Sequence, residues 1–256
     1  MMRYLFIINS KANPKELRRL DDAIADLEDD IRSRIELRYT DYPGHCTDMA
    51  IEASDRSGDK VTIVACGGDG TIHEAVNALA HRNTPLIIVP MGTGNDFART
   101  VLKNDYRKKP MSIIKHLDEV KYIPIDLVRL DSYDVLGSHL PVWSRYFANV
   151  ASIGLDTKVQ ACAKSIVAQK DTSFNRKTAY FQAIFRLLKG NESFRLSYSL
   201  EIDGGDVNEV SENEEFTLIS ICNGRYYGGG FCPAPDAKID DGVLDICIIE
   251  KASLLY

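Results

Sequence analysis

Two glycine-rich turns carry the residues of this sequence that are best suited to chemistry. The first, "GGDGT", covers residues 67–71, and the second, "MGTGND", covers residues 91–96. Each turn lies between an apolar run and a helical pattern, and each contains one carboxylate, Asp69 or Asp96. A helix N-terminus binds phosphate, but a carboxylate there repels it unless a metal ion or a hydroxyl group lies between. The pattern therefore favours Mg²⁺-nucleotide chemistry over simple anion binding.

Neither turn matches the commoner nucleotide-binding fingerprints. The chain has no GxxxxGK[ST] P-loop and no GxGxxG dinucleotide spacing. Each turn alone could be an ordinary loop, in which Asp69 or Thr71 caps the next helix and Asn95 is an N-cap. Two such turns weaken that alternative, because the carboxyl ends of parallel strands line one crevice.

The elements that position these turns alternate between strand-like and helix-like patterns. Parallel strands need crossover connections, so this alternation predicts a parallel, doubly wound α/β sheet. The predicted strands are residues 4–8, 35–40, 61–66 and 85–90, with helical patterns at about 14–31, 46–54 and 71–81.

The pattern changes at about Lys121, where strands begin to dominate. We place the boundary at Ile123, which gives an α/β nucleotide-binding domain at residues 1–123 and a β-rich domain, a sandwich or distorted barrel, at residues 124–256. Strand-like segments cover residues 121–130, 143–154, 194–203, 215–223 and 242–250, and helical patterns cover 155–169 and 177–189.

Composition narrows the class of protein. The 256 residues are 45% hydrophobic, which is ample for globular cores. A net charge of −6 argues against nucleic-acid binding, which usually needs a basic face. The six cysteines lack metal-ligand spacing and are typical of reduced thiols in a cytoplasmic protein. No apolar stretch approaches the ~18 residues needed to span a bilayer.

Both turns belong to longer sequence motifs. "GGDGTIHEAVNAL" and "PMGTGNDFAR" together resemble the catalytic domain of the diacylglycerol kinase and sphingosine kinase superfamily, especially bacterial diacylglycerol kinase-like lipid kinases. "FANVASIGLDTKV" and "GGGFCPAPDAKIDDGVLD" are weaker matches to the same family. The resemblance implies an N-terminal nucleotide-binding domain, a C-terminal β-sandwich and an active site between them. It also implies ATP and Mg²⁺ as cofactors, and transfer of phosphoryl to diacylglycerol or a related lipid alcohol.

The resemblance implies site residues as well. Asp69 and Asp96 become catalytic candidates in the Mg²⁺-ATP network. Asp241 matches a structural metal position, completed by the backbone carbonyls of Lys238 and Val243, although a plain Asp-Gly hairpin turn is an equal alternative. The ATP-contacting positions fall on Asn9, Thr40, Gly67, Gly68, Gly70, Thr71, Glu74, Gly92, Thr93 and Asn95.

The chain departs from the family pattern in two places. Its first loop reads "INSKANP" instead of Asn-Pro followed by Ser-Gly, so Ser10 and Lys11 must serve the phosphates differently. Relatives also continue to a "DGE"-like segment whose glutamate is a candidate general base, and the sequence reaches Tyr256 without one. We therefore expect an incomplete kinase with weak or no turnover in this form. The alternative is that Asp69 takes over the contact with the acceptor hydroxyl.

The expected partners follow from the same resemblance. A lipid substrate implies transient contact with the inner face of the membrane, and a homodimer is a further expectation. Residues 176–189 combine an aromatic-apolar face with flanking basic residues, which suits a bilayer surface, but a helix packed on the sandwich is the alternative we prefer. Two other functions stay open. They are an NAD kinase, which shares the GGDGT turn, and a nucleotide-binding regulator without catalysis.

Overall fold

The computed structural model describes residues 2–134, 140–169, 172, 178–179, 182–183, 186–187, 193–201 and 207–251. The chain forms two compact units. The first comprises residues 1–149, 223–232 and 238–243, and the second comprises residues 150–222, 233–237 and 244–256. The domain boundary expected after residue 123 stays a prediction.

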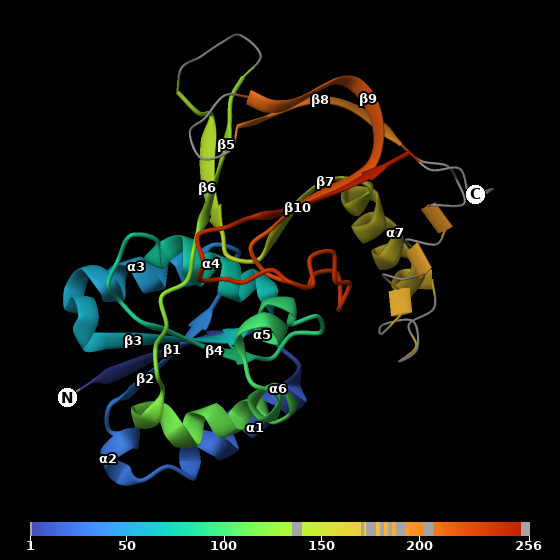
Figure 1. The fold of residues 1–256 in the computed structure, drawn as a ribbon. Coiled ribbons are helices and arrows are strands. Elements are labelled where there is room, and N and C mark those ends of the chain that lie inside the picture. Colours follow the sequence, from blue (N-terminus) through green and yellow to red (C-terminus); the bar gives the residue numbers. More distant parts are fainter. Residues whose placement is uncertain are drawn as a thin grey trace. The chain divides into compact units, whose positions relative to one another are not determined.

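A four-stranded parallel sheet forms the centre of the first unit (Figure 1). Its strands lie in the order β2-β1-β3-β4, and Phe6 in β1 is in register with Leu37 in β2 and Val64 in β3. The four predicted strands and the parallel arrangement are confirmed. The strands are β1 (Arg3–Asn9), β2 (Ile35–Thr40), β3 (Val61–Gly67) and β4 (Leu86–Pro90).

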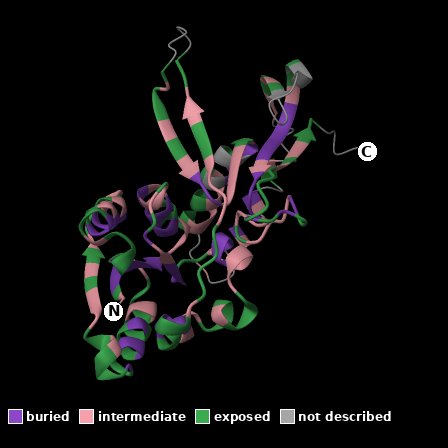
Figure 2. Ribbon diagram, turned by 60° about the vertical axis from the view of Figure 1, so that its left-hand side comes forward, coloured by how far each residue is buried: buried purple, intermediate pink, exposed green. Residues whose placement is uncertain are grey.

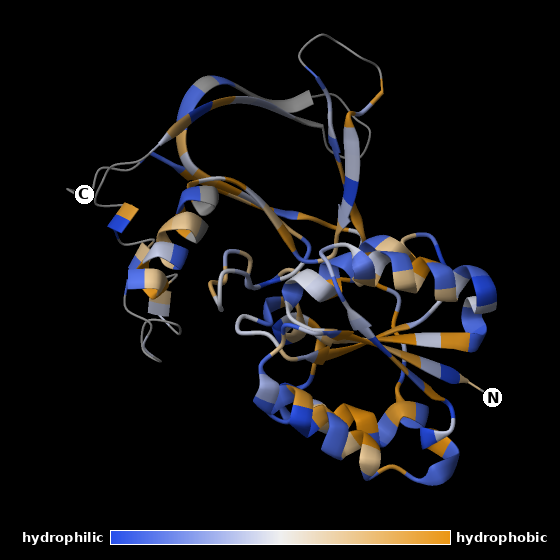
Figure 3. Cartoon of the chain, turned by 180° about the vertical axis from the view of Figure 1, so that it is seen from behind, coloured by the Kyte–Doolittle hydropathy of each residue, from blue (hydrophilic) through white to orange (hydrophobic). Residues whose placement is uncertain are grey.

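Helices cover both faces of this sheet because side chains alternate along each strand. Tyr4, Phe6 and Ile8 are buried against one set of helices, and Leu5 and Ile7 are buried against the other. Figure 2 shows the resulting buried strands, and Figure 3 shows their hydrophobic residues in orange. The first set is α1 (Pro14–Ala25) and the 3-10 segment η2 (Pro110–Glu119); the second is α3 (His45–Ser57) and α4 (Asp69–Leu79).

An antiparallel hairpin, β5 (Val128–Ser132) and β6 (Trp143–Phe147), also belongs to the first unit. The strand expected from Lys121 begins only at Val128, since Pro124 offers no N–H group for a ladder. The side-chain amide of Asn77 in α4 joins this hairpin to the sheet layer, accepting from Tyr146 N at 2.9 Å and donating to Tyr146 O at 2.8 Å. The shorter helices of the unit are α2 (Asp29–Arg32), η1 (Gly58–Lys60), α5 (Asp96–Val101) and α6 (Asn104–Lys108).

The second unit is built on an antiparallel sheet, as the sequence predicts. The long strand β9 (Val207–Cys222) pairs with β7 (Val150–Gly154), β8 (Phe194–Glu201) and β10 (Asp245–Glu250). Helix α7 (Leu155–Gln169) follows β7 at the predicted position. Most of the amphipathic stretch 176–189 lies outside the described residues. Within the described ranges, no helix combines the length and apolar character needed to cross a bilayer.

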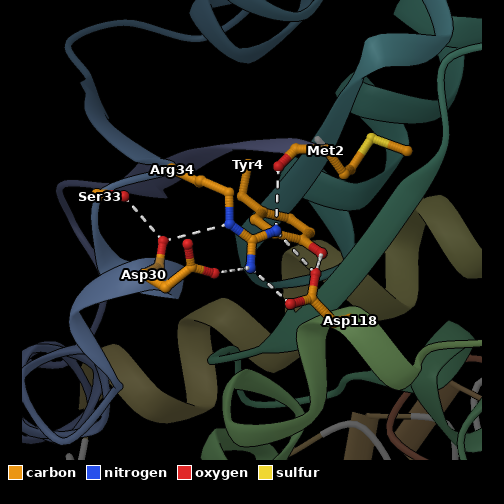
Figure 4. Close-up of polar contacts among 6 residues, drawn as sticks. All are labelled: Met2, Tyr4, Asp30, Ser33, Arg34 and Asp118. Atoms are coloured by element: carbon orange, nitrogen blue, oxygen red, sulfur yellow. Dashed lines mark hydrogen bonds and ion pairs between the residues drawn. The ribbon is translucent and has the colours of Figure 1, made fainter.

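A polar network closes the amino-terminal edge of the parallel sheet (Figure 4). The guanidinium of Arg34 donates two hydrogen bonds to Asp118, at 2.9 and 2.6 Å, and two to Asp30, at 3.2 Å to its carboxylate and 3.3 Å to its carbonyl. The buried ring of Tyr4 donates its hydroxyl to Asp118 at 2.6 Å. These bonds hold the start of β1, the start of β2 and η2 together, at the edge opposite the glycine-rich turns.

Candidate functional site

The carboxyl ends of the four parallel strands form the edge that carries the two glycine-rich turns. The strand order makes the gap between β1 and β3 the topological switch point, because the chain moves outward from β1 in both directions. At this gap, Asn9 donates from Nδ2 to Oγ1 of Thr71 at 3.3 Å. Open α/β sheets bind ligands at such switch points. The geometry therefore brings two predicted site residues together where a ligand is expected.

The two glycine-rich turns touch each other through their backbones. A methyl group on Gly92 would lie 2.5 Å from Cα of Gly68, closer than two such atoms can approach. Position 92 therefore requires glycine for the close approach, and a methyl group on Gly68 would be tight, at 3.2 Å from Cα of Gly92. The N–H of Met91 also donates to the carbonyl of Gly67 at 2.7 Å. The two predicted turns thus form one continuous surface.

Asn95 fixes the shape of the second turn. Its backbone is left-handed, with φ of 51°, a conformation that Asn tolerates better than most residues. Its side chain accepts a hydrogen bond from Gly92 N at 2.9 Å and donates one to Gly92 O at 2.8 Å. The amide therefore closes the loop around Gly92, which leaves Thr93 exposed at the tip.

Hydrogen bonds order the loop after β1. Asn9 Oδ1 accepts from Lys11 N at 2.9 Å, and Asn13 caps α1 by accepting from Lys15 N at 2.9 Å. Ser10 donates from its hydroxyl to Thr40 O at 2.5 Å. These bonds order the loop in which this sequence departs from the family pattern.

A pocket of about 500 Å³ opens between this loop and the second glycine turn. Two cationic side chains, Lys11 and Arg19, lie in its lining, where a phosphate-bearing ligand would need them. Arg19 is paired with Glu16 at 2.8 Å. The predicted nucleotide residues in the lining are Asn9, Gly68, Gly92, Thr93 and Asn95.

Asp69 and Asp96 come together beside the pocket, on either side of Gly94. A methyl group on Gly94 would lie 3.0 Å from Oδ2 of Asp69 and 3.4 Å from Oδ2 of Asp96. Asp69 uses its other oxygen to accept from Phe97 N at 3.2 Å, at the start of α5. Both carboxylates therefore approach the backbone of Gly94 from nearby positions. Magnesium commonly takes one or two protein carboxylates and completes its shell with phosphate and water, so these two side chains are the candidates to hold it.

The environment of Asp96 supports that fit. The side chain is buried, and among the described residues its Oδ1 has no hydrogen-bond partner, although Arg99 Nε lies 3.3 Å away. Burial raises the pKa of Asp96, and the neighbouring charge of Asp69 adds to that effect. A buried carboxylate beside a second one is costly unless cations share it, and the ion pair with Arg99 meets part of that cost.

Sequence reasoning missed the contact that holds Asp96 from the far end of the chain. Gly229 donates its N–H to Asp96 Oδ2 at 2.8 Å, across 133 residues of sequence. Its segment is anchored by Asn223, which donates to Ala148 O at 2.9 Å, and by Asn149, which donates to Tyr226 O at 2.7 Å. The only sequence signal was the run of three glycines at 228–230, all with positive φ.

Five predicted ATP-contacting residues lie outside the pocket lining, namely Thr40, Gly67, Gly70, Thr71 and Glu74. The carboxylate of Glu74 accepts from Gly44 N at 2.9 Å and from Cys46 N at 3.2 Å, so it caps the N-terminus of α3. Thr40 ends β2, and its carbonyl receives the hydroxyl of Ser10. Gly67, Gly70 and Thr71 complete the first turn, and a methyl group on Gly67 would collide with Oγ1 of Thr71 at 2.3 Å.

The three predicted structural-metal residues lie in a separate loop of the first unit. Asp241 Oδ1 accepts from Val243 N at 3.1 Å, which is the bond expected of a local Asx turn. Asp126 tethers the loop by accepting from Gly242 N at 2.7 Å, and its own N–H donates to Ile239 O. Across the part of the chain that the structure describes, no group of three or more His, Cys, Asp or Glu side chains could hold a metal ion, so the role of Lys238, Asp241 and Val243 stays a prediction.

Comparison with known proteins agrees with this geometry. Residues 3–130 match the family model of the diacylglycerol kinase catalytic domain, and residues 149–255 match that of the YegS C-terminal NAD kinase beta sandwich-like domain. The chain therefore belongs to the diacylglycerol kinase catalytic-domain family, within which its relatives are described as lipid kinases.

Individual relatives give the same assignment. A "Probable lipid kinase YegS-like" protein of Xanthomonas campestris is 33% identical over 195 residues, which are 73% of this chain and 56% of the relative. Its Pseudomonas aeruginosa counterpart is 32% identical over 190 residues, 73% of this chain and 54% of the relative. A solved structure described as a "putative diacylglycerol kinase" from Bacillus anthracis aligns with 97% of this chain and 74% of its own, at 26% identity and a TM-score of 0.69. The chain thus spans about half the length of these curated relatives.

Proposed function

We propose that this protein is an ATP-dependent lipid kinase that transfers the γ-phosphoryl of Mg-ATP to the hydroxyl of diacylglycerol or a related lipid alcohol. The observation that carries the proposal is the pair Asp69 and Asp96 around Gly94, beside a pocket bounded by two interlocked glycine turns. Family membership supports ATP use. Because this chain matches only about half the length of its curated relatives, the activity and substrate of the whole protein are part of this proposal.

The pocket supplies the groups that a polyphosphate needs. Backbone at Gly68 and Gly92 is open to close approach, and Lys11 contributes a cation from an ordered loop. This lysine would do the work that a P-loop lysine does in other nucleotide-binding folds. Arg19 forms an ion pair with Glu16, so it would contribute less than Lys11 to phosphate binding.

The two carboxylates have complementary roles in the proposal. Asp69 and Asp96 would hold Mg²⁺, which would neutralise charge on the phosphoryl oxygens. Asp69 is the more accessible of the two, so it would also orient the acceptor hydroxyl and accept its proton. Arg99, 3.3 Å from Asp96 and bonded to Gly94 O at 3.3 Å, would keep the second turn in shape.

An acceptor screen tests the proposal. The protein is incubated with ATP labelled at the γ-phosphate and Mg²⁺, together with diacylglycerol micelles, a sphingoid base or NAD in separate reactions. We expect label in the organic phase with a lipid acceptor. Weak turnover would fit the incomplete kinase expected from the sequence, and rapid turnover would favour Asp69 as the group that contacts the acceptor hydroxyl. Label in NADP alone would instead identify an NAD kinase, and saturable ATP binding with no labelled product would identify a regulatory nucleotide-binding protein.

A further inference from the structure

The β5–β6 hairpin of the first unit exposes more large apolar side chains than a stable surface hairpin needs. The five residues lie within 14 positions of sequence, on the two strands and on the residues next to them. A grouped set of exposed apolar side chains usually marks an interaction surface. Their exposed fractions are 38% for Leu130, 54% for Tyr133, 76% for Leu140, 64% for Val142 and 46% for Trp143.

These side chains lie on both faces of the hairpin. Leu130 and Trp143 share one face, because Trp143 is in register with Ser132, two residues from Leu130. Strand alternation directs Val142 to the other face, and Val142 N bonds to Ser132 O at 2.6 Å. A protein partner would cover one face of such a ribbon. Apolar side chains exposed on both faces instead suit a lipid environment that surrounds the hairpin.

The side chains are also graded along the hairpin. At the base of the hairpin, Val128 pairs with Phe147. Moving away from this base, the chain presents exposed Arg145, then Trp143, and then the aliphatic side chains of Val142 and Leu140. Cations suit phosphate head groups, aromatic rings suit the interface, and aliphatic groups suit the acyl region. Arg145 and Val142 are three residues apart, roughly 10 Å along an extended strand, which matches the depth of interfacial insertion.

The acidic side chains of the hairpin set a limit on this depth. Asp131 is neutralised within the hairpin, since it accepts from Arg129 at 2.9 Å and from Ser144 at 2.6 Å. Asp134 lies next to the apolar end and is exposed, so it keeps that end from going deeper than the interface. Within the described ranges, no carboxylate forms an ion pair with Arg145, which leaves it available for a phosphate.

We infer that the β5–β6 hairpin docks this protein on a lipid bilayer by inserting Leu140, Val142 and Trp143 into the interface, with Arg145 against phospholipid phosphates. The inference rests on the proposed function, because a kinase that modifies a lipid must reach it.

Trp143 is the one tryptophan of the sequence, so its fluorescence reports on the hairpin directly. The protein is titrated with vesicles of equal amounts of phosphatidylcholine and phosphatidylglycerol, with and without lipids brominated on the acyl chains. We expect a shift of the emission to shorter wavelength and quenching by the brominated lipids. Val142→Asp and Leu140→Asp should each weaken vesicle binding at least about tenfold, because each adds a charge at the inserted end.

Leu37→Asp provides the control, since Leu37 is an exposed leucine, at 41%, on strand β2 outside the hairpin. It should bind vesicles as the wild type does, and thermal unfolding verifies that all variants fold. Unchanged Trp143 emission with vesicles would overturn the inference, and so would an emission shift that follows protein concentration alone, which would indicate a second copy as the partner.

A parallel reaction separates this inference from the proposed function. The protein is given a short-chain diacylglycerol dissolved without vesicles. Phosphorylation of that substrate, together with no Trp143 response in the vesicle titration, would overturn hairpin docking and leave the kinase proposal standing. A Trp143 response without phosphorylation of any lipid would support docking and count against the kinase proposal.

Discussion

Gly68 and Gly92 meet backbone to backbone, so closely that a methyl group on Gly92 would lie 2.5 Å from Cα of Gly68. The contact joins the turns that follow β3 and β4 into one surface at the sheet edge. It explains why both turns contain glycine at these positions, and it makes the site sensitive to the smallest possible substitution.

Gly92→Ala should lower the free energy of unfolding by about 1–3 kcal/mol, since the added methyl group forces the turns apart. Gly70→Ala is the matched control. Nothing lies within 4 Å of the methyl group it would add, and in the first turn of α4 alanine should stabilise by up to about 1 kcal/mol. Urea unfolding of both variants measures the difference. Equal stabilities would show that the close approach is not a constraint.

Lys11→Ala should raise the KM for ATP about tenfold and change kcat little, because it removes a cation from the phosphate side of the pocket. Lys15→Ala, four residues along the same loop and helix, lies outside the lining and should leave KM within about twofold. Steady-state kinetics at varied ATP gives both values. If the two variants behave alike, Lys11 is an ordinary surface lysine.

Asp96→Asn should remove the effect of magnesium on nucleotide binding. In the wild type, ATP should raise the melting temperature more with Mg²⁺ than without it, because a ligand stabilises the folded state that binds it. The asparagine can still accept from Gly229 N, so the fold should survive while the magnesium-dependent increment is lost. Asp59→Asn, at an exposed aspartate of η1 outside the site, serves as control and should keep the increment. Retention of the increment in Asp96→Asn would contradict the assignment.

Asp118 should make stability depend on pH at the other edge of the sheet. Arg34, and then Tyr4, lower the pKa of Asp118 from 3.8 to about 2. A lowered carboxyl pKa means that the carboxylate stabilises the fold fully above pH 4, and that this stability is lost as pH falls from 4 towards 2. Asp118→Asn mimics the protonated group and should cost about 1 kcal/mol at pH 7, a value moderated by solvent exposure.

Chemical unfolding across this pH range tests the prediction. The difference between wild type and Asp118→Asn should be constant above pH 5 and should shrink below pH 4. Asp30→Asn removes the more exposed partner of Arg34 and should have a smaller effect. A difference that grows on acidification would have the wrong sign for this network.

The parallel sheet could be predicted because its signals are local. Strands β1, β3 and β4 are continuous apolar runs, each is buried, and each ends at a loop rich in glycine or asparagine. The expected pairing of Asp69 with Asp96 follows from topology alone, since neighbouring parallel strands deliver their loops to one edge.

Other parts of the site depend on contacts that no local pattern carries. Gly229 reaches Asp96 across 133 residues, and Gly242 reaches Asp126 across 116. Glu74 shows a second limit of prediction from local sequence patterns. The family resemblance implied a nucleotide contact for Glu74, which stays a prediction. No local pattern indicated that its carboxylate accepts from the N–H groups that begin α3.

The central claim is that Asp69 works at the centre of a phosphoryl-transfer site. Asp69→Asn keeps an oxygen to accept from Phe97 N, so it tests the charge without removing the cap of α5. The measurement is transfer of labelled γ-phosphate from ATP to diacylglycerol by the wild type and by Asp69→Asn, with melting temperatures recorded for both. We predict label in the lipid with the wild type and at least about a hundredfold less with the variant at equal stability. Equal transfer by Asp69→Asn would contradict the account.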